Sequence, residues 1–219
     1  LTTDPPLDLA ECIDIVVHRS AWHPGESSFE SPHNGLDRVW ELCRYTIEAT
    51  SSDLYVDTPT RERGAYEGDL LIHQMSHYSV ERSYALARYS GEYLSRRPTW
   101  PSEYHLMPVI CAWRDYLATG DDRQLQSDFE LWEQSNFDLK ISENGLICKH
   151  PGNTTDSWNA DAVDWPTSCR DGFEFTEYNV VLNAFQFAAY VALERIAEAT
   201  DRDKSRSEYA AKAVAMRAA

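Results

Sequence analysis

Basic residues are scarce in this sequence. Lysine and arginine together number 20 against 36 aspartates and glutamates, which gives a formal net charge of −16 at pH 7. A nucleic acid or an anionic membrane surface needs positive charge opposite its phosphates. The sequence also contains no uninterrupted run of about 18 apolar residues, the length of a membrane-spanning helix. We therefore expect neither a nucleic acid nor a membrane as partner, and a neutral or cationic ligand is favoured.

Closely spaced pairs of cysteines are missing as well. The five cysteines are widely spaced and no CxxC motif occurs: Cys12, Cys43, Cys111, Cys148 and Cys169. An odd number at this spacing is typical of buried thiols rather than of a disulfide framework or a zinc site. No signal-peptide pattern stands at the start and a helical pattern continues to the last residue, so we expect a piece of a longer protein. The compartment stays open, since a cytoplasmic and a secreted bacterial enzyme fit equally well.

Apolar residues, in contrast, recur with helical spacing over most of the chain. Leu36, Val39, Trp40, Cys43 and Ile47 form one apolar stripe of a helix. Further helices are predicted to begin near Gly68, Tyr84, Glu103, Asp122, Tyr178 and Asp203, with ends marked by Pro98 and Gly120. The stretch from Ser142 to Gly172 is predicted to be poor in helix.

Residues 1–30 differ from the remainder. Ile13, Ile15 and Val17 alternate along the chain, which is a short strand signal. A lone strand cannot satisfy its own backbone groups. We interpret residues 1–30 as the tail of an upstream β-sandwich domain and residues 31–219 as a helical domain, with a disordered leader as the alternative for the first segment.

The predicted fold class is all-α, with about seven helices. Helix follows helix through connections that are sometimes long, which suits a toroid whose alternate helices line an inner and an outer ring. It equally suits an irregular bundle, and periodicity does not separate the two. No internal sequence repeat is visible, so a regular solenoid is not expected.

Charges of both signs are concentrated at residues 57–69, DTPTRERGAYEGD. Pro59, Gly64 and Gly68 interrupt any helix there, so the segment is predicted to form a shaped loop. An arginine can keep one acid ionised while a second acid beside Tyr66 is held protonated, as acid catalysis in a hydrolase requires. The alternative is a solvated loop with surface ion pairs worth about 0–1 kcal/mol each. Composition alone favours this alternative.

The loop resembles the acidic signature of the α-L-rhamnosidases of glycoside hydrolase family 78. The shared pattern is Asp-x-Pro-x-Arg-Glu-Arg, followed by an aromatic residue and then by Gly-Asp. Residues 36–47, residues 116–121 and the pair Asp164-Trp165 are also similar, so the resemblance runs from about Ser28 to the end. It implies an (α/α)6 catalytic barrel behind β-sandwich domains, with this chain as the N-terminal, incomplete part of the barrel.

The resemblance also implies roles for individual residues. Glu62 matches the general acid of the family. Groups that hold the rhamnose hydroxyls and set the pKa of the acid are matched by Asp57, Arg61 and Asp69. Two aromatic positions of the sugar pocket are matched by Tyr66 and by Trp165, next to Asp164. Tyr66 replaces a tryptophan common in the family, so it offers a smaller aromatic face and substrate choice can differ.

The reaction implied is inverting hydrolysis of a terminal α-L-rhamnosyl bond in an oligosaccharide or glycoside, with no metal and no cofactor. Glu62 would protonate the departing oxygen, while a second carboxylate roughly 6.5–9.5 Å away activates water. The family base lies in the second half of the barrel, and no residue of this chain matches it. We therefore expect the remainder of the same polypeptide to be a partner, and the 219-residue chain to be inactive or very weak alone.

Two further groups of residues are weaker indications of a functional site. His73 and His77 stand four residues apart, as metal ligands on a helix do, but no third ligand is near in sequence, so we interpret them as packing or surface residues. An acidic and aromatic segment suits sugar contact, and equally suits an ordered loop closing one end of the helices: Trp158, Asp161, Asp164 and Trp165.

Two other functions stay open at this point. One is a non-catalytic carbohydrate-binding or scaffold fragment whose loop keeps the shape without the reaction. The other is a helical-barrel hydrolase of other glycosides, such as glucosides or glucuronides. Substitution of Glu62 by glutamine tests the first, and a panel of aryl glycosides tests the second.

Overall fold

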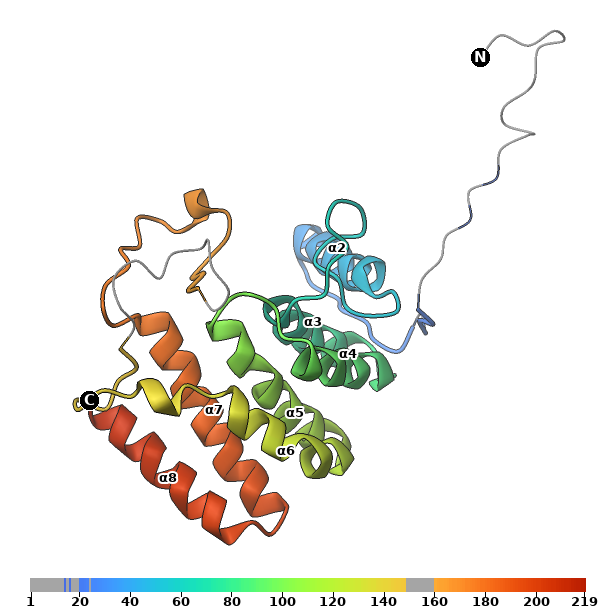
Figure 1. Ribbon diagram of the computed structural model, residues 1–219. Coiled ribbons are helices and arrows are strands. Elements are labelled where there is room, and N and C mark those ends of the chain that lie inside the picture. The colour runs from blue at the N-terminus through green and yellow to red at the C-terminus, as the bar shows by residue number, and fades with distance from the viewer. Residues whose placement is uncertain (1–13, 15, 17–19, 24, 149–159) are drawn as a thin grey trace, which may run out of the picture.

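The computed structural model describes residues 14, 16, 20–23, 25–148 and 160–219 (Figure 1). Within these ranges the chain forms seven α-helices and no strand, so the all-α prediction is confirmed. The helices are α2 (Asn34–Thr50), α3 (Glu67–Val80), α4 (Ala85–Arg96), α5 (Met107–Thr119), α6 (Arg123–Ser135), α7 (Val180–Ala199) and α8 (Asp203–Ala218). Short 3-10 turns lie at η1 (Glu103–Leu106), η2 (Asp138–Lys140) and η3 (Thr167–Cys169).

Alternate helices pack in two layers. Helix α5 contacts α3 on one side and α7 on the other, while α4 contacts α6. Each helix also contacts the next one along the chain, as antiparallel hairpins do (Figure 1). Since direction reverses at each hairpin, the N-terminal ends of α3, α5 and α7 lie at the same end of the layer that these three helices form.

The main core lies among α5, α6, α7 and α8. Its largest fully buried side chains include Trp132 and Phe129 of α6, which pack in one cluster with Leu193 and Ile196 of α7. By length and composition alone α7 would be apolar enough to cross a membrane, and it is half-buried inside the protein. The buried contacts with α5, α6 and α8 account for its high hydropathy, since it is the central helix of this core.

A smaller cluster joins α3, α4 and α5. It contains Tyr55, Leu70, Ala87, Leu94 and Cys111. Helix α5 ends where the sequence predicts, because Gly120 adopts the left-handed conformation with φ of 70°. Helix α7 begins where the Asn179 side chain accepts hydrogen bonds from two backbone N–H groups of its first turn.

Two sequence interpretations are wrong in part. The apolar stripe of α2 is not a buried face: Leu36, Val39 and Cys43 are exposed, and Ile47 near the end of the helix is buried. Among the described residues α2 packs chiefly against α3, so much of its apolar surface has no neighbour there. The four described cysteines are free thiols, yet Cys43 and Cys169 are exposed and only Cys111 of the four is buried.

Some predictions fall outside the described residues. The strand residues Ile13, Ile15 and Val17 lie there, and so does Trp158 of the acidic and aromatic segment. The assignment of residues 1–30 to an upstream β domain therefore stays a prediction.

Candidate active site

The acidic loop is closed by its first aspartate. The backbone N–H of Asp57 donates to the carbonyl of Gly64 at 2.9 Å, and its carboxylate accepts from the Gly64 N–H at 2.9 Å. A Cβ atom on Gly64 would stand 2.7 Å from the Tyr66 ring. Glycine at this position therefore lets the Tyr66 ring pack directly against the loop backbone, which fixes the loop shape ahead of α3.

Both carboxylate oxygens of Glu62 are held by donors. The Arg61 Nη1 atom lies 2.6 Å from Oε1, and the Tyr66 hydroxyl donates to Oε2 at 3.1 Å. The Glu62 side chain is 34% exposed, while that of Arg61 is 72% exposed. The predicted acid is therefore oriented by its neighbours and accessible from solvent.

Asp69 lies in the first turn of α3, close to the loop carboxylates. Its pKa is raised to about 6, mainly by burial and then by the negative charges of Asp57 and Glu62. The sequence predicts one acid of this loop to be held protonated; burial raises the pKa of Asp69 and also that of Glu67. The charge coupling also places Asp57, Glu62 and Asp69 in one electrostatic cluster.

Tyr66 keeps its proton at neutral pH. Burial raises the pKa of its phenol, and the hydrogen bond to Glu62 and the charge of that carboxylate raise it further. Tyr66 is therefore a fixed hydrogen-bond donor to Glu62 rather than a proton source.

The beginning of α3 is tied to the segment before α5. The buried Glu67 carboxylate accepts from the Thr99 backbone N–H at 2.8 Å and also from the Thr99 hydroxyl. Gly68 packs against the Tyr104 ring so closely that a Cβ there would stand 2.7 Å from Cζ. These contacts bring Tyr104 of η1 beside the acidic loop.

A second buried glutamate holds the segment that carries Asp164 and Trp165. The Glu103 carboxylate accepts from the backbone N–H of Ala162 at 3.0 Å and of Val163 at 2.5 Å. Trp165 is exposed, and its ring meets the Trp100 ring edge-on with centroids 6.0 Å apart. The Trp165 segment is thereby placed over the start of η1.

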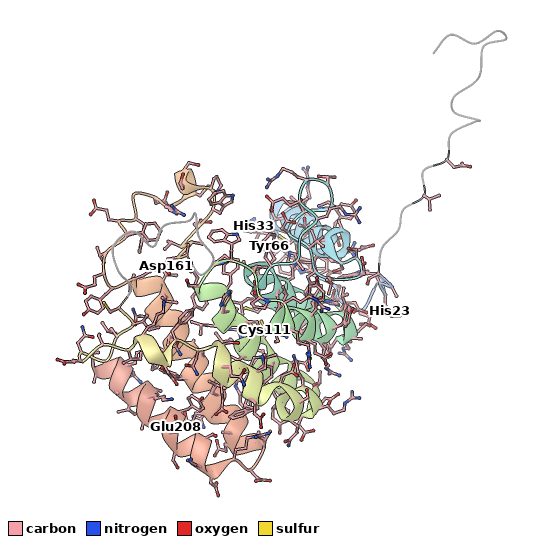
Figure 2. The ribbon with its side chains drawn as sticks, in the orientation of Figure 1. His23, His33, Tyr66, Cys111, Asp161 and Glu208 are labelled. Atoms are coloured by element: carbon pink, nitrogen blue, oxygen red, sulfur yellow. The ribbon has the colours of Figure 1, made fainter. Side chains whose placement is uncertain are left out.

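Tyr104 connects the two predicted parts of the site. Its pKa is raised to about 12, mainly by burial, and the charges of Asp69 and Asp164 are among the smaller causes. The acidic loop and the Asp164 segment, about 100 residues apart in the sequence, therefore both lie near one phenol. In Figure 2 the labelled Tyr66 and Asp161 lie at the same end of the helices.

Some of the residues singled out in the sequence have structural roles in the fold. Asp161 is buried and accepts a hydrogen bond of 2.9 Å from the amide of Asn179, which anchors the loop to the start of α7. His73 and His77 are buried on α3, as the packing interpretation expects. Burial lowers the pKa of His73 to about 4, so it is neutral at physiological pH.

Four residues of the site escape the sequence reasoning: Trp100, Tyr104, Glu67 and Glu103. Three of them share the short stretch TWPSEY, in which aromatic and acidic residues gather immediately before a helix. That composition could have identified the stretch as part of the site from the sequence. The role of Glu67 is visible only in the structure, because its partner Thr99 is 32 residues away.

The arrangement suits a neutral ligand rich in hydroxyl groups. Carboxylates accept hydrogen bonds from hydroxyls, phenols such as Tyr104 donate and accept, and indole faces pack on C–H surfaces. An oriented, solvent-accessible carboxyl next to a more basic carboxyl can also serve proton transfer.

Comparison with known proteins gives one family match. Residues 24–219 match the family described as the bacterial alpha-L-rhamnosidase 6 hairpin glycosidase domain. No match is found among curated proteins. The match covers the acidic loop, the Tyr104 region and the Asp164 segment together.

Proposed function

The chain belongs to the family of bacterial α-L-rhamnosidase six-hairpin glycosidase domains, and from this premise we propose that it acts on a terminal α-L-rhamnosyl residue by inverting hydrolysis. Glu62 is the general acid in this proposal. The observation that carries it is the Glu62 carboxylate, held between Arg61 and Tyr66 within electrostatic range of Asp69. Membership in the family supports the glycosidase class, and this geometry supports the assignment of the acid.

The bond changes follow from the chemistry of acetal hydrolysis. A protonated Glu62 gives its proton to the glycosidic oxygen as the bond from that oxygen to the sugar breaks. Water adds to the opposite face of the ring, and a second carboxylate takes the proton that this water releases. Arg61 is exposed enough to turn from Glu62 toward the substrate, whereas Tyr66 stays on Oε2 and keeps the carboxyl oriented.

The sugar contacts are assigned by the same reasoning. Asp57, Arg61, Asp69 and Asp164 would bind the sugar hydroxyls, with the Tyr104 hydroxyl near the last two. The rings of Tyr66 and Trp165 would lie against apolar C–H faces of the sugar. Below about pH 6 a protonated Asp69 would be able to donate a hydrogen bond as well as accept one, because its pKa is raised to about 6.

Binding is the first test, because binding does not need the second carboxylate. We expect L-rhamnose to show saturable binding to the chain in ligand-observed NMR, and D-glucose or D-glucuronate to bind at least about tenfold more weakly. Trp165→Ala and Asp69→Asn are expected to weaken rhamnose binding. Stronger binding of glucose or glucuronate would instead assign the domain to another class of glycosides.

The general acid is tested by the leaving group. In protein that hydrolyses aryl α-L-rhamnosides, Glu62→Gln should lower the rate on a poor leaving group by about 10²–10⁴-fold. The loss should be much smaller with an activated leaving group such as dinitrophenolate, which departs without a proton. Glu30→Gln, an exposed glutamate outside the loop, is the matched control.

Two results would redirect the proposal. Equal losses on both substrates would show that Glu62 does not act as an acid. Rhamnose binding without any turnover that depends on Glu62 would favour a carbohydrate-binding role. We expect the 219-residue chain alone to bind rhamnose and to turn it over weakly or not at all.

A further inference from the structure

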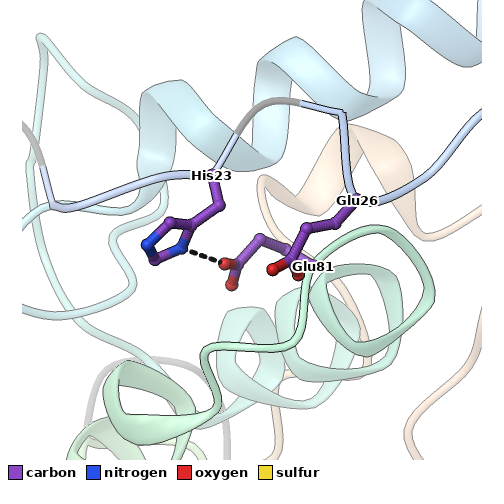
Figure 3. A group of neighbouring side chains, drawn as sticks. All are labelled: His23, Glu26 and Glu81. Atoms are coloured by element: carbon purple, nitrogen blue, oxygen red, sulfur yellow. Dashed lines mark hydrogen bonds and ion pairs between the residues drawn. The ribbon is translucent and has the colours of Figure 1, made fainter.

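A second cluster of charged side chains lies at the opposite end of α3 from the acidic loop. It consists of His23, Glu26 and Glu81, whose potential ligand atoms all lie within 4.8 Å of one another. Figure 3 shows the three side chains converging, with Nδ1 of His23 on Oε1 of Glu81 at 2.7 Å. His23 and Glu81 are 58 residues apart in the sequence, so the fold brings the three groups together.

Glu81 is held in place by donors behind it. Its side chain is 1% exposed, and its Oε2 atom accepts from the Ser83 backbone N–H at 2.7 Å and from His77 Nε2 at 2.8 Å. The other ring nitrogen of His77 contacts the buried Tyr55 hydroxyl. Oε2 thus has its own hydrogen-bond donors, while Oε1 contacts Nδ1 of His23. Hydrogen bonds of this kind, made by groups behind a ligand, orient metal ligands in proteins.

One carboxylate oxygen of Glu26 is held by the backbone. Its Oε2 accepts from the Arg82 backbone N–H at 2.8 Å, which fixes the carboxylate beside Glu81. Two carboxylates therefore approach one imidazole from different segments. The two carboxylates lie at short range from each other, an arrangement that a cation would stabilise.

We propose that His23 Nδ1, Glu26 and Glu81 bind a divalent metal cation of the zinc type. Zn²⁺ takes imidazole nitrogen and carboxylate oxygen together, with three protein ligands and water in the fourth position. Ca²⁺ and Mg²⁺ prefer sites made of oxygen alone, so the imidazole selects against them. This site was not predictable from the sequence, since its ligands share no short motif.

The position of the site indicates that a bound cation would tie two segments of the chain together. It joins the segment around residues 20–26 to the turn between α3 and α4, which also carries the Ser83 N–H. Helix α3 separates Glu81 from Asp69 by roughly 20 Å at 1.5 Å per residue. The cation would therefore fasten the N-terminal segment to the helices without touching the acidic loop, and the inference does not depend on the proposed function.

The test is a titration of the chain with Zn²⁺ alone, followed by calorimetry and by thermal unfolding. We expect one saturable Zn²⁺ site and a rise in Tm of a few degrees at saturating metal, since a ligand that binds the folded state stabilises it. His23→Ala and Glu26→Gln should each weaken Zn²⁺ binding at least about tenfold. Both residues are exposed, so these variants are expected to fold.

Matched controls come from the same segment. His33→Ala and Glu30→Gln change exposed residues of the same types outside the cluster and should leave Zn²⁺ affinity unchanged. Ca²⁺ should bind at least about tenfold more weakly than Zn²⁺. The proposal is overturned if Zn²⁺ shows no saturable site, if His23→Ala and Glu26→Gln leave its affinity unchanged, or if Ca²⁺ binds as tightly.

Discussion

The two sides of this molecule bury apolar and polar side chains in different proportions. Helices α5 to α8 enclose the larger apolar cluster, with Trp132, Leu193 and Ile196 among its members and a few polar side chains such as Gln186 buried beside it. Most of the residues that helix α3 buries are polar: Glu67, His73, Gln74 and His77. Beside it, α2 exposes Leu36, Val39, Leu42 and Tyr45 to solvent.

The apolar cluster contributes mainly to stability, whereas the buried polar groups of α3 position the candidate sites. Apolar burial is proportional to area and non-directional, so the α5–α8 cluster supplies cohesion without specifying a ligand. Each buried polar group needs a hydrogen-bond partner, and each of these hydrogen bonds holds a backbone segment in place. On the α3 side these hydrogen bonds place the acidic loop, the Tyr104 region and the cluster around Glu81.

The largest expected effect is on the apolar side. Leu193→Ala removes a fully buried side chain at the centre of the α5–α8 cluster and should cost about 3 kcal/mol of unfolding free energy, as core Leu→Ala changes do. Urea denaturation followed by circular dichroism measures it. A cost below about 1 kcal/mol would mean that the core relaxes around the cavity, and the contrast between the two sides would fail.

The next effect is on the polar side and depends on pH. Asp69 has a folded-state pKa of about 6 against a reference value of 3.8, mainly because of burial. An acid with a raised pKa binds its proton more tightly when folded, so the stability that it contributes below pH 4 is lost as pH rises toward 6. Asp69→Asn should remove this loss and add about 1 kcal/mol at pH 7, a figure reduced for partial solvent exposure.

The measurement is urea denaturation of the wild type and of Asp69→Asn at pH 4 and pH 7. The difference between the two proteins should grow with pH, whereas the difference between wild type and Leu193→Ala should not. A gain at pH 7 accompanied by loss of rhamnose binding would mark Asp69 as a residue kept for function at a cost in stability.

The smallest expected effect is on α2. Leu42→Ala is the same chemical change as Leu193→Ala, made on an exposed side chain, and should alter the unfolding free energy by less than about 0.5 kcal/mol. The same denaturation measurement applies. A cost above about 2 kcal/mol would show that this face is covered in solution, and α2 would then belong with the apolar side of the comparison.

Helix positions could be predicted from the sequence to a good approximation. The Gly120 end of α5 and the pattern from Tyr178 to Ile196 in α7 correspond to the observed helices, because helix ends and apolar periodicity are local properties. The face that each helix buries was less predictable. The stripe on α2 has the right period, yet whether a stripe is covered depends on its neighbours in space.

The candidate site was predicted in two separate pieces. The loop at residues 57–69 is recognisable because its charged residues are adjacent in the sequence, and the pair Asp164-Trp165 because of a resemblance. That the two pieces share Tyr104 was not predictable, since the contact of Gly68 with the Tyr104 ring spans 36 residues.

The sequence by itself therefore determined the helical class, the succession of helices and the short acidic signature, all of which depend on residues close together along the chain. Tertiary structure alone decided that the pKa of Asp69 is raised, that Tyr104 lies near both acidic segments and that Glu81 contacts His23. The physical reason is that burial and charge proximity arise from packing between distant segments, which no local pattern encodes.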